Sequence, residues 1–528
     1  MSNSLSASQD LYCHRLRRLF FAYGLTPLFL FGLQISFSTH AAADTLSGEI
    51  VDKESGKPVA ARLYIRGPKS WHLAQSNDPT GNAVPSRKVR AGLSEIHTTL
   101  SAHPFTAELD AGEYSLVVER GKEYLPWTGT VKMPSPKPVR IELQRFANLA
   151  EQGWYSGETH VHRKLSELPT LMMAEDLNVA FPLTSWETRA YRSPRLPEGT
   201  PDQLIRLDDT HVIWPRNTEY EIFTVDGKQH TLGAFFILGH KKPYTLGLPP
   251  IEPVAGRAVR GDALIELDKH NWEWSMAIIP ILDVDLYELA NNHVWRVGFG
   301  FPDWAEKPAK YMNIEYDAKG KLTEWGWIDF GFQNYYALLN SGFHLRPTAG
   351  TASGVHPVPF AYGRVYVHLD GPFSYEKWYA GLNAGRSFVT TGPLLYTSVD
   401  DQLPGTRMKQ NAAHTSHVDV RVVNPTPLTS IELVRNGDVL SSLRPESKRL
   451  PSGAYEAKAS FEVSFPASGW VAVRAIERKK DGRVRFAHTS PVYVDVAGKP
   501  LHPRKKETAY LIERVQSQID RSRSVIKP

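Results

Sequence analysis

Both ends of the chain show the alternation of apolar and polar residues that is typical of β-strands. Residues 44–146 contain β-type runs such as 114–118, which are bounded by turn-forming residues. The same pattern returns over residues 401–498, where Asn436-Gly437 is a strong signal for a tight hairpin turn. Short strands at regular spacing are typical of a β-sandwich. We therefore predict an all-β sandwich on each side of the central region.

The central region, residues 147–400, combines helical and strand patterns. The apolar spacing predicts a short helix over 168–177 and buried strands over 179–184 and 276–281. Asp226-Gly227 lies between two apolar runs and predicts a β-hairpin. Strand–helix units repeated over this length suit an α/β barrel, in which the strand ends and the loops after them hold the site.

The first 43 residues have the pattern of an export signal. Basic residues precede a largely apolar run over 19–37, and Ala41-Ala42-Ala43 forms a cleavage site before Asp44. The run is also long enough for an uncleaved membrane anchor, but its Pro and Gly residues favour removal. We expect a periplasmic or extracellular protein, cleaved near Ala43, with no membrane span in the mature chain.

Two other stretches complete the pattern. Residues 67–94 are polar and rich in turn formers, which predicts a long surface loop. Residues 499–528 include an amphipathic segment, which predicts a C-terminal helix. That helix either packs on the body of the protein or serves as a partner-binding tail.

Composition narrows the possible classes of function. At 528 residues, 41% hydrophobic and 22% charged, the chain has the make-up of a globular protein with several domains. The net charge of +5 is mild and spread along the chain, and no basic stripe or nucleic-acid-binding motif is present, so we expect no nucleic-acid partner. Cys13 is the only cysteine and precedes the apolar run, which excludes disulfides and thiolate chemistry in the mature chain.

His160-Val161-His162 carries the strongest chemical signal. In an extended segment alternate side chains share a face, so the two imidazoles point the same way and Val161 points away. Two imidazoles on one face can bind a metal ion, with Asp, Glu or further His residues completing the coordination. Histidine pairs also occur for purely structural reasons, but the turn-rich residues 153–157 before this pair favour a site.

Three ordered motifs resemble those of the polymerase and histidinol phosphatase (PHP) metallohydrolases, and most closely their carbaryl-hydrolase-like branch. Residues 157–162 are similar to the GDxHxH motif of that family, residues 339–351 to its LLNaGxrlpxxaGtD segment, and residues 378–393 to its W...L..GR.fvT.GP signature. The resemblance implies a distorted (β/α)7 barrel with one to three divalent ions, such as Zn, Mn or Fe. In the N-terminal region, residues 110–114 resemble a turn of carboxypeptidase-regulatory-like β-sandwich domains.

The PHP resemblance also implies a set of metal ligands. His160 and His162 match the first ligand pair, and Glu221 matches a glutamate that often bridges two ions. His230 matches the next histidine, and His356 falls just after the second motif, where the family usually ends in Asp-x-His. Two of these residues can also have no role in metal binding. Glu221 can be a solvated carboxylate at a strand edge, and His230 can be an exposed side chain.

The chain departs from the family pattern at two places. Thr184-Ser185-Trp186 stands where the family commonly has Thr-Asp-His, so Trp186 replaces a ligand. Thr351 and Ser353 stand near the expected final aspartate. The number of metal ions therefore stays open. The residues that are close enough along the chain to compensate are His270, Asp283, Asp285 and His293.

Two further residues are candidates for catalytic roles. Glu288 follows a buried run and forms a polar cluster with Asn291, Asn292 and His293, which can position a substrate or ligand, or can simply cap a helix. Arg386 lies in the third motif, where it can bind an anionic group or stabilise an oxyanion. A structural arginine that ties the central region to the C-terminal sandwich is the alternative.

The sequence thus predicts an exported metal-dependent hydrolase. A metal-activated water would cleave an ester, amide, carbamate or phosphoester of a small-molecule or carbohydrate-like substrate. The alternative is a degenerate barrel that binds an extracellular carbohydrate or other ligand without turnover, or a scaffold in which the sandwiches bind partners. The sequence leaves the oligomeric state open.

Overall fold

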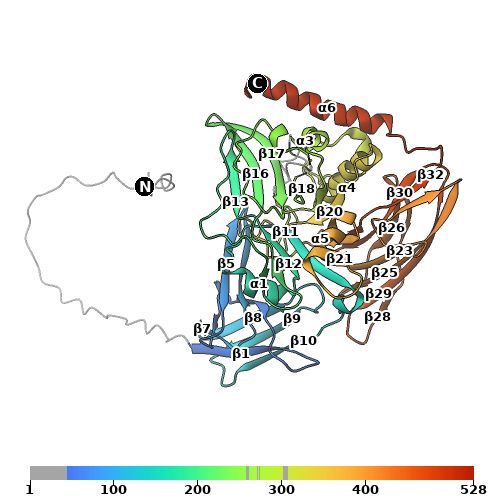
Figure 1. Ribbon diagram of the computed structural model, residues 1–528. Helices are drawn as coiled ribbons and strands as arrows, with labels where there is room; N and C mark the ends of the chain where they lie inside the picture. Colours follow the sequence, from blue (N-terminus) through green and yellow to red (C-terminus); the bar gives the residue numbers. More distant parts are fainter. Residues whose placement is uncertain (1–43, 257–260, 270–271, 273, 301–306, 528) are drawn as a thin grey trace, which may run out of the picture. The chain divides into compact units, whose positions relative to one another are not determined.

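The computed structural model describes residues 44–256, 261–269, 272, 274–300 and 307–527 (Figure 1). The predicted export signal and His270 lie outside the described residues. Residues 43–528 form one compact unit. None of the helices in the described part of the chain has the length and apolar character that crossing a bilayer needs.

The N-terminal region consists of two sheets that share one apolar core, as in a β-sandwich. Leu46 and Phe105 from the first sheet and Leu63 and Leu116 from the second meet in that core. In sheet order, the first contains β10 (Val139–Leu143), β1 (Asp44–Asp52), β7 (Phe105–Leu109) and β4 (Gln75–Ser76). The second contains β5 (Ala83–Arg90), β6 (Leu93–Leu100), β2 (Ala61–Arg66), β8 (Gly112–Glu119) and β9 (Trp127–Met133), with β3 (Trp71–His72) beside β2.

Residues 67–94 were expected to form a loop, but much of this stretch is β-structure. β5 pairs with β6 in an antiparallel hairpin, from Ala83 opposite Leu100 to Arg90 opposite Leu93. Polar side chains alternate with Val84 and Ser86, which are buried. A strand with one exposed face is rich in polar residues, which is why composition alone suggested a loop.

A 12-stranded sheet continues from the central region into the C-terminal region. Its main path is β14 (Ile205–Arg206), β15 (Val212–Ile213), β12 (Val179–Pro182), β11 (Trp154–Val161), β21 (Arg364–His368), β22 (Ser387–Thr390), β31 (Val484–Thr489), β30 (Gly469–Arg478), β26 (Ser430–Arg435) and β27 (Asp438–Leu443). β32 (Val492–Val496) pairs with β30 and with β24 (Arg407–Gln410). This continuous sheet crosses the predicted boundary at residue 400.

The C-terminal part of that sheet packs on a four-stranded sheet in a sandwich-like arrangement. The two sheets share a core that includes Val420 and Val463 from one and Val473 and Ala487 from the other. In order, the smaller sheet contains β23 (Leu394–Val399), β25 (His414–Asn424), β29 (Tyr455–Phe465) and β28 (Ser447–Arg449).

The remaining sheet has the order β13 (Ser185–Arg189), β16 (Thr218–Val225), β17 (Lys228–Leu238), β18 (Leu264–Leu267), β19 (Leu286–Ala290) and β20 (Arg346–Ala349). β16 and β17 form the predicted hairpin around Asp226 and Gly227, whose φ angles are +47° and +77°. Positive φ at both turn positions is the geometry of the tight type I′ hairpin.

The predicted (β/α)7 barrel is wrong. Among the described residues, strand outweighs helix by 42% to 15%, in five sheets and five helices. β17 is antiparallel to both of its neighbours, β16 and β18, and β11 belongs to a different sheet. A barrel needs each strand to be followed by a long helical crossover, whereas the two-residue turn after β16 reverses the chain directly.

The described helices are α1 (Leu168–Glu175), α3 (Trp274–Leu282), α4 (Glu324–Asn340), α5 (Tyr375–Ala384) and α6 (Lys505–Ser522). α3 covers the run 276–281 that was expected to be a strand. A continuous apolar run fits a buried helix as well as a buried strand, so periodicity could not separate them. α6 lies beside α3 and α4 (Figure 1), where Tyr510 donates a hydrogen bond of 2.8 Å to Asn334 Oδ1.

Candidate metal centre

The histidine pair lies at the end of β11. The ring centroids of His160 and His162 are 5.2 Å apart, whereas Val161 packs with Leu168 and Leu171 in a separate core. This is the alternation that an extended strand dictates. Gly350 permits the close packing around His160, because a Cβ on that glycine would lie 2.2 Å from His160 Cβ and 2.6 Å from Glu288 Oε1.

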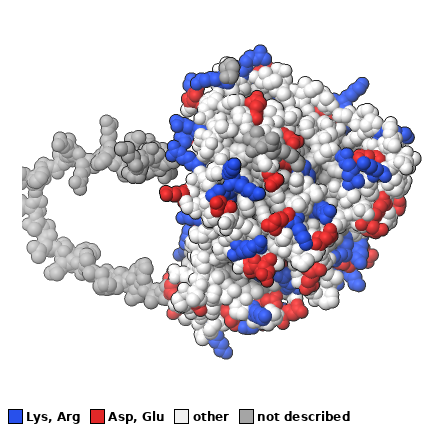
Figure 2. Space-filling view, in the orientation of Figure 1, with Lys and Arg blue, Asp and Glu red and all other residues white. Residues whose placement is uncertain are grey.

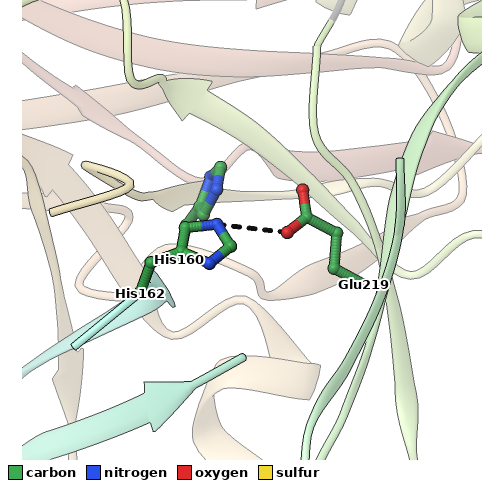
Figure 3. A group of neighbouring side chains, drawn as sticks. All are labelled: His160, His162 and Glu219. Atoms are coloured by element: carbon green, nitrogen blue, oxygen red, sulfur yellow. Dashed lines mark ion pairs between the residues drawn. The ribbon is translucent and has the colours of Figure 1, made fainter. Parts of the chain in front are cut away.

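Strand β16 supplies two carboxylates opposite the histidines. Glu219 and Glu221 are two residues apart, so both point to the same side of the strand. Figure 3 shows the carboxylate of Glu219 directed at His162, with 3.1 Å between Oε2 and Nε2. Glu219 is fully buried, and neither of its carboxylate oxygens has a hydrogen-bond partner among the described residues. A buried carboxylate with no donor is costly, and a bound cation would offset that cost.

The ends of β18 and β19 complete the cluster. Glu288 lies on β19, and its two carboxylate oxygens are 3.2 and 3.3 Å from His160 Nδ1. Asp268 follows β18, with Oδ1 at 3.6 Å from the same nitrogen. The neighbouring Lys269 forms an ion pair with Asp268, and its Nζ lies 3.2 Å from Glu221 Oε1. A buried ammonium therefore lies between two of the carboxylates.

Burial dominates the electrostatics of these groups. Burial, and then the nearby Asp268, raises the pKa of Glu219 well above its usual range. Burial likewise raises the pKa of Glu221 to about 7, although Lys269 opposes the shift. Burial lowers the pKa of His162 to about 4 and that of His160 well below its usual value. The imidazoles are therefore neutral at pH 7, which is the form that binds metal ions.

The donor atoms form three overlapping groups that could hold a metal ion: His160, His162 and Glu219; His160, Asp268 and Glu288; and Glu219, Glu221 and Asp268. Ligand atoms that each lie ~2.0–2.2 Å from one ion are roughly 3–3.6 Å from one another. In the first group, the separation of 3.1 Å between His162 Nε2 and Glu219 Oε2 falls in this range. In the second group, the separations of 3.2 and 3.6 Å from His160 Nδ1 to Glu288 and Asp268 also fall in it, but that nitrogen cannot bind an ion while it is hydrogen-bonded to Glu288. The arrangement thus fits a divalent ion with nitrogen and oxygen ligands.

Trp186 forms part of the outer wall of the site. Its ring centroid lies 4.6 Å from that of His162, and its Nε1 donates a hydrogen bond of 3.1 Å to Glu221 Oε2. The side chain is 41% exposed, whereas the groups behind it are buried. Trp186 therefore offers an aromatic surface to solvent beside the groups that could hold a metal ion.

His356 and His293 lie near the cluster but have other contacts. His356 Nδ1 is 3.1 Å from an Arg90 guanidinium nitrogen at the end of β5, so the N-terminal region reaches this side of the site. His293 stacks on Trp327 at 4.2 Å, and its Nδ1 donates a hydrogen bond of 3.0 Å to the Gly300 carbonyl. Neither histidine belongs to the three groups of potential ligands among the described residues.

His230 and Arg386 lie elsewhere. His230 Nε2 is 3.2 Å from Ser522 Oγ at the end of α6. Arg386 directly follows Gly385, which ends α5 in the left-handed conformation, and its side chain is 48% exposed and paired with Asp370 at 3.1 Å. The structure does not bring either residue to the cluster.

Sequence reasoning missed Glu219, Asp268 and Lys269. The first was detectable, because Glu219 and Glu221 repeat the alternation of His160 and His162. Asp268 and Lys269 follow a short apolar run without a distinctive motif. Their part in the site depends on which strand lies beside β17, and this is a tertiary property.

Comparison with known proteins does not assign the chain to a family. No family model matches the chain, and none of the curated proteins matches it.

Proposed function

We propose that the chain is a metal-dependent hydrolase whose ion is held by His160, His162 and Glu219. The observation that carries this proposal is the buried Glu219 carboxylate, whose oxygens lack hydrogen-bond partners and face a neutral imidazole. The similarity of residues 157–162 to the PHP opening motif supports hydrolysis as the reaction class. The proposal depends on this group of ligands and does not require a barrel.

Lys269 sets the number of ions in this proposal to one. Its ammonium lies between Asp268 and Glu221, which otherwise form a group of potential ligands with Glu219. A fixed ammonium neutralises these carboxylates as a second divalent ion would. The cluster therefore resembles a binuclear carboxylate site in which the ammonium of Lys269 takes the place of one metal ion.

A bound divalent ion lowers the pKa of water and polarises a scissile carbonyl or phosphoryl bond. The protein supplies orientation and shape. Glu288 holds the His160 ring through Nδ1, and Lys269 fixes the Glu221 carboxylate. The exposed ring of Trp186 offers an apolar surface for the part of a substrate next to the scissile bond.

The substrate class in this proposal is a small molecule with an ester, amide, carbamate or phosphoester bond. Zn, Mn and Fe all accept the nitrogen and oxygen ligands of the site. Export to the periplasm or beyond the cell is part of the same proposal and rests on the pattern of the first 43 residues.

Metal analysis of the purified protein tests the proposal. We expect about one Zn, Mn or Fe per chain, and loss of that ion in the His160→Ala/His162→Ala double variant. His230→Ala is the matched control, because this histidine contacts α6 and should leave the metal content unchanged. A panel of esters, carbamates and phosphoesters would then identify the substrate class, with the double variant as the inactive reference.

Two results would contradict the proposal. If the protein stays metal-free after expression in metal-replete medium, the hydrolase proposal fails, and a ligand-binding protein is the alternative. Equal metal content in the double variant and in His230→Ala would show that the ion binds elsewhere.

A further inference from the structure

A second polar cavity lies apart from the proposed metal ligands. It has a volume of about 660 Å³ and is bounded by residues of the N-terminal sheet, the loop after β22 and the start of β31. Its lining includes the cations Arg62, Lys122, Arg296, Arg483 and Arg485. The volume is within the range of small-molecule sites.

The arginines on one side of the cavity share a small number of carboxylates. Glu119 pairs with both Arg62 and Arg296, each at 2.7 Å. Glu175 pairs with Arg62 and also with Arg364, which lies 3.0 Å away. Each carboxylate thus already binds two guanidinium groups, so it has little capacity left for a further cation.

Glu324, which does not itself line the cavity, binds two more of the arginines in the same way. Glu324 pairs with Arg483 at 2.6 Å and with Arg485 at 3.5 Å. Glu477 lies 3.8 Å from Lys479, and both side chains line the cavity. Counting Lys479, six cationic side chains line the cavity, against the four carboxylates of Glu119, Glu175, Glu477 and Asp481.

Lys122 is the cation without a carboxylate partner. Among the described residues, its ammonium donates to the Thr391 carbonyl at 2.9 Å and lies 4.1 Å from the centre of the Tyr362 ring, with no carboxylate at ion-pair distance. The Tyr362 hydroxyl is buried and has no hydrogen-bond partner among the described residues. Burial, and then Arg364 and Arg485, lowers the pKa of Lys122 well below its usual value. An anion beside Lys122 would favour its ammonium form, which has three donors, so this side chain retains capacity for a ligand.

We propose that this cavity binds a small polyvalent oxyanion of the phosphate class, anchored by Lys122 and the Tyr362 hydroxyl. Such an anion would balance the excess of cationic side chains in the lining, and it would accept hydrogen bonds from the remaining donors of Lys122 and from the Tyr362 hydroxyl. Charge-assisted hydrogen bonds to phosphate oxygens are short and strong, and the surrounding guanidinium groups add a favourable field. The site is independent of the proposed hydrolase centre.

Calorimetric titration of the purified protein with inorganic pyrophosphate tests this proposal. We expect saturable binding at one site, weakened about tenfold or more in Lys122→Met, because a hydrogen bond to a charged group is lost. Tyr362→Phe removes only the hydroxyl and should weaken binding by a smaller factor. Lys458→Met changes a lysine whose side chain is 70% exposed, and it should bind like the wild type.

The His160→Ala/His162→Ala double variant separates the two proposals, since its pyrophosphate binding should persist even though the metal centre is removed. Circular dichroism checks folding, and Lys122→Gln replaces Lys122→Met if the latter does not fold. The proposal is overturned if binding is absent, or if Lys122→Met and Lys458→Met weaken it equally. Binding that disappears with the histidine pair would also overturn it, because the anion would then bind at the metal centre.

Discussion

Replacement of Glu219 by glutamine separates metal binding from folding. Burial and Asp268 raise the pKa of Glu219 well above its usual range, so the neutral form of this side chain is favoured when no cation is bound. Glutamine resembles that neutral form in size and polarity. We therefore expect Glu219→Gln to leave the stability of the metal-free protein almost unchanged and to reduce strongly the stabilisation that metal provides.

The size of the effect follows from linkage. At a metal concentration of about 100 Kd, binding to the folded state alone stabilises by about 2.7 kcal/mol. An unfolding entropy of ~2.1 cal/mol/K per residue over the compact unit Ala43–Pro528 gives about 1 kcal/mol/K, so Tm rises by about 3 °C. Loss of partners that merely orient a ligand costs about 10–100-fold in affinity, and loss of a direct ligand should cost at least about 100-fold. The shift for Glu219→Gln then falls below about 0.5 °C.

Calorimetric Tm values of wild type and variant, each with and without metal, provide the test. Glu187→Gln is the matched control, because Glu187 is also buried but accepts hydrogen bonds from the backbone N–H groups of Thr188 and Arg189. That control should keep the full metal shift. An unchanged shift in Glu219→Gln, or an equal fall of its Tm with and without metal, would refute the assignment of Glu219 as a ligand.

Three further predictions concern other buried groups and the wall of the site. Lys269→Met removes the ammonium between Asp268 and Glu221, so we expect a loss of about 3–5 kcal/mol in the free energy of unfolding without metal. Partial recovery with excess Zn or Mn, together with a rise in bound metal, would support the proposal that Lys269 takes the place of a second ion. Unchanged stability would contradict it. Trp186→Ala should raise KM for the substrate found by screening while leaving metal content unchanged, and loss of metal instead would make Trp186 a structural residue of the centre. Burial lowers the folded-state pKa of His488 to about 3, below the unfolded value of about 6.5, so the neutral imidazole contributes stability above pH 6.5 that is lost as the pH falls toward 3. The free energy of urea unfolding should therefore depend less steeply on pH in His488→Gln than in the wild type over this interval. Identical slopes would contradict the prediction.

Local patterns predicted local structure well. The turn at Asp226 and Gly227 is present because its backbone conformation is determined by two residues and their neighbours. The helix expected over 168–177 is α1, Leu168–Glu175. The strand predicted over 276–281 was wrong, because a largely buried segment has no polar face from which its period can be determined.

The predicted ligands illustrate the same limit at the level of the site. His160 and His162 were paired correctly on one face of a strand, because the side-chain alternation of a strand is a local property. His230 was expected beside them, but it lies near the start of β17, where its ring contacts Ser522 of α6. Position along a strand decides which end of the sheet a side chain reaches, and the sequence pattern carried no information about that end.

The sequence by itself determined the strand that carries the histidine pair, the hairpin turn and the apolar faces that form the cores of the sandwich-like sheets. Tertiary structure alone decided that β17 runs antiparallel between β16 and β18, and that Glu219, Asp268 and Lys269 join the histidines. The physical reason is that turn conformation and side-chain alternation depend on neighbouring residues. Sheet order and buried charge pairing instead depend on contacts between segments far apart in the chain, which no local pattern encodes.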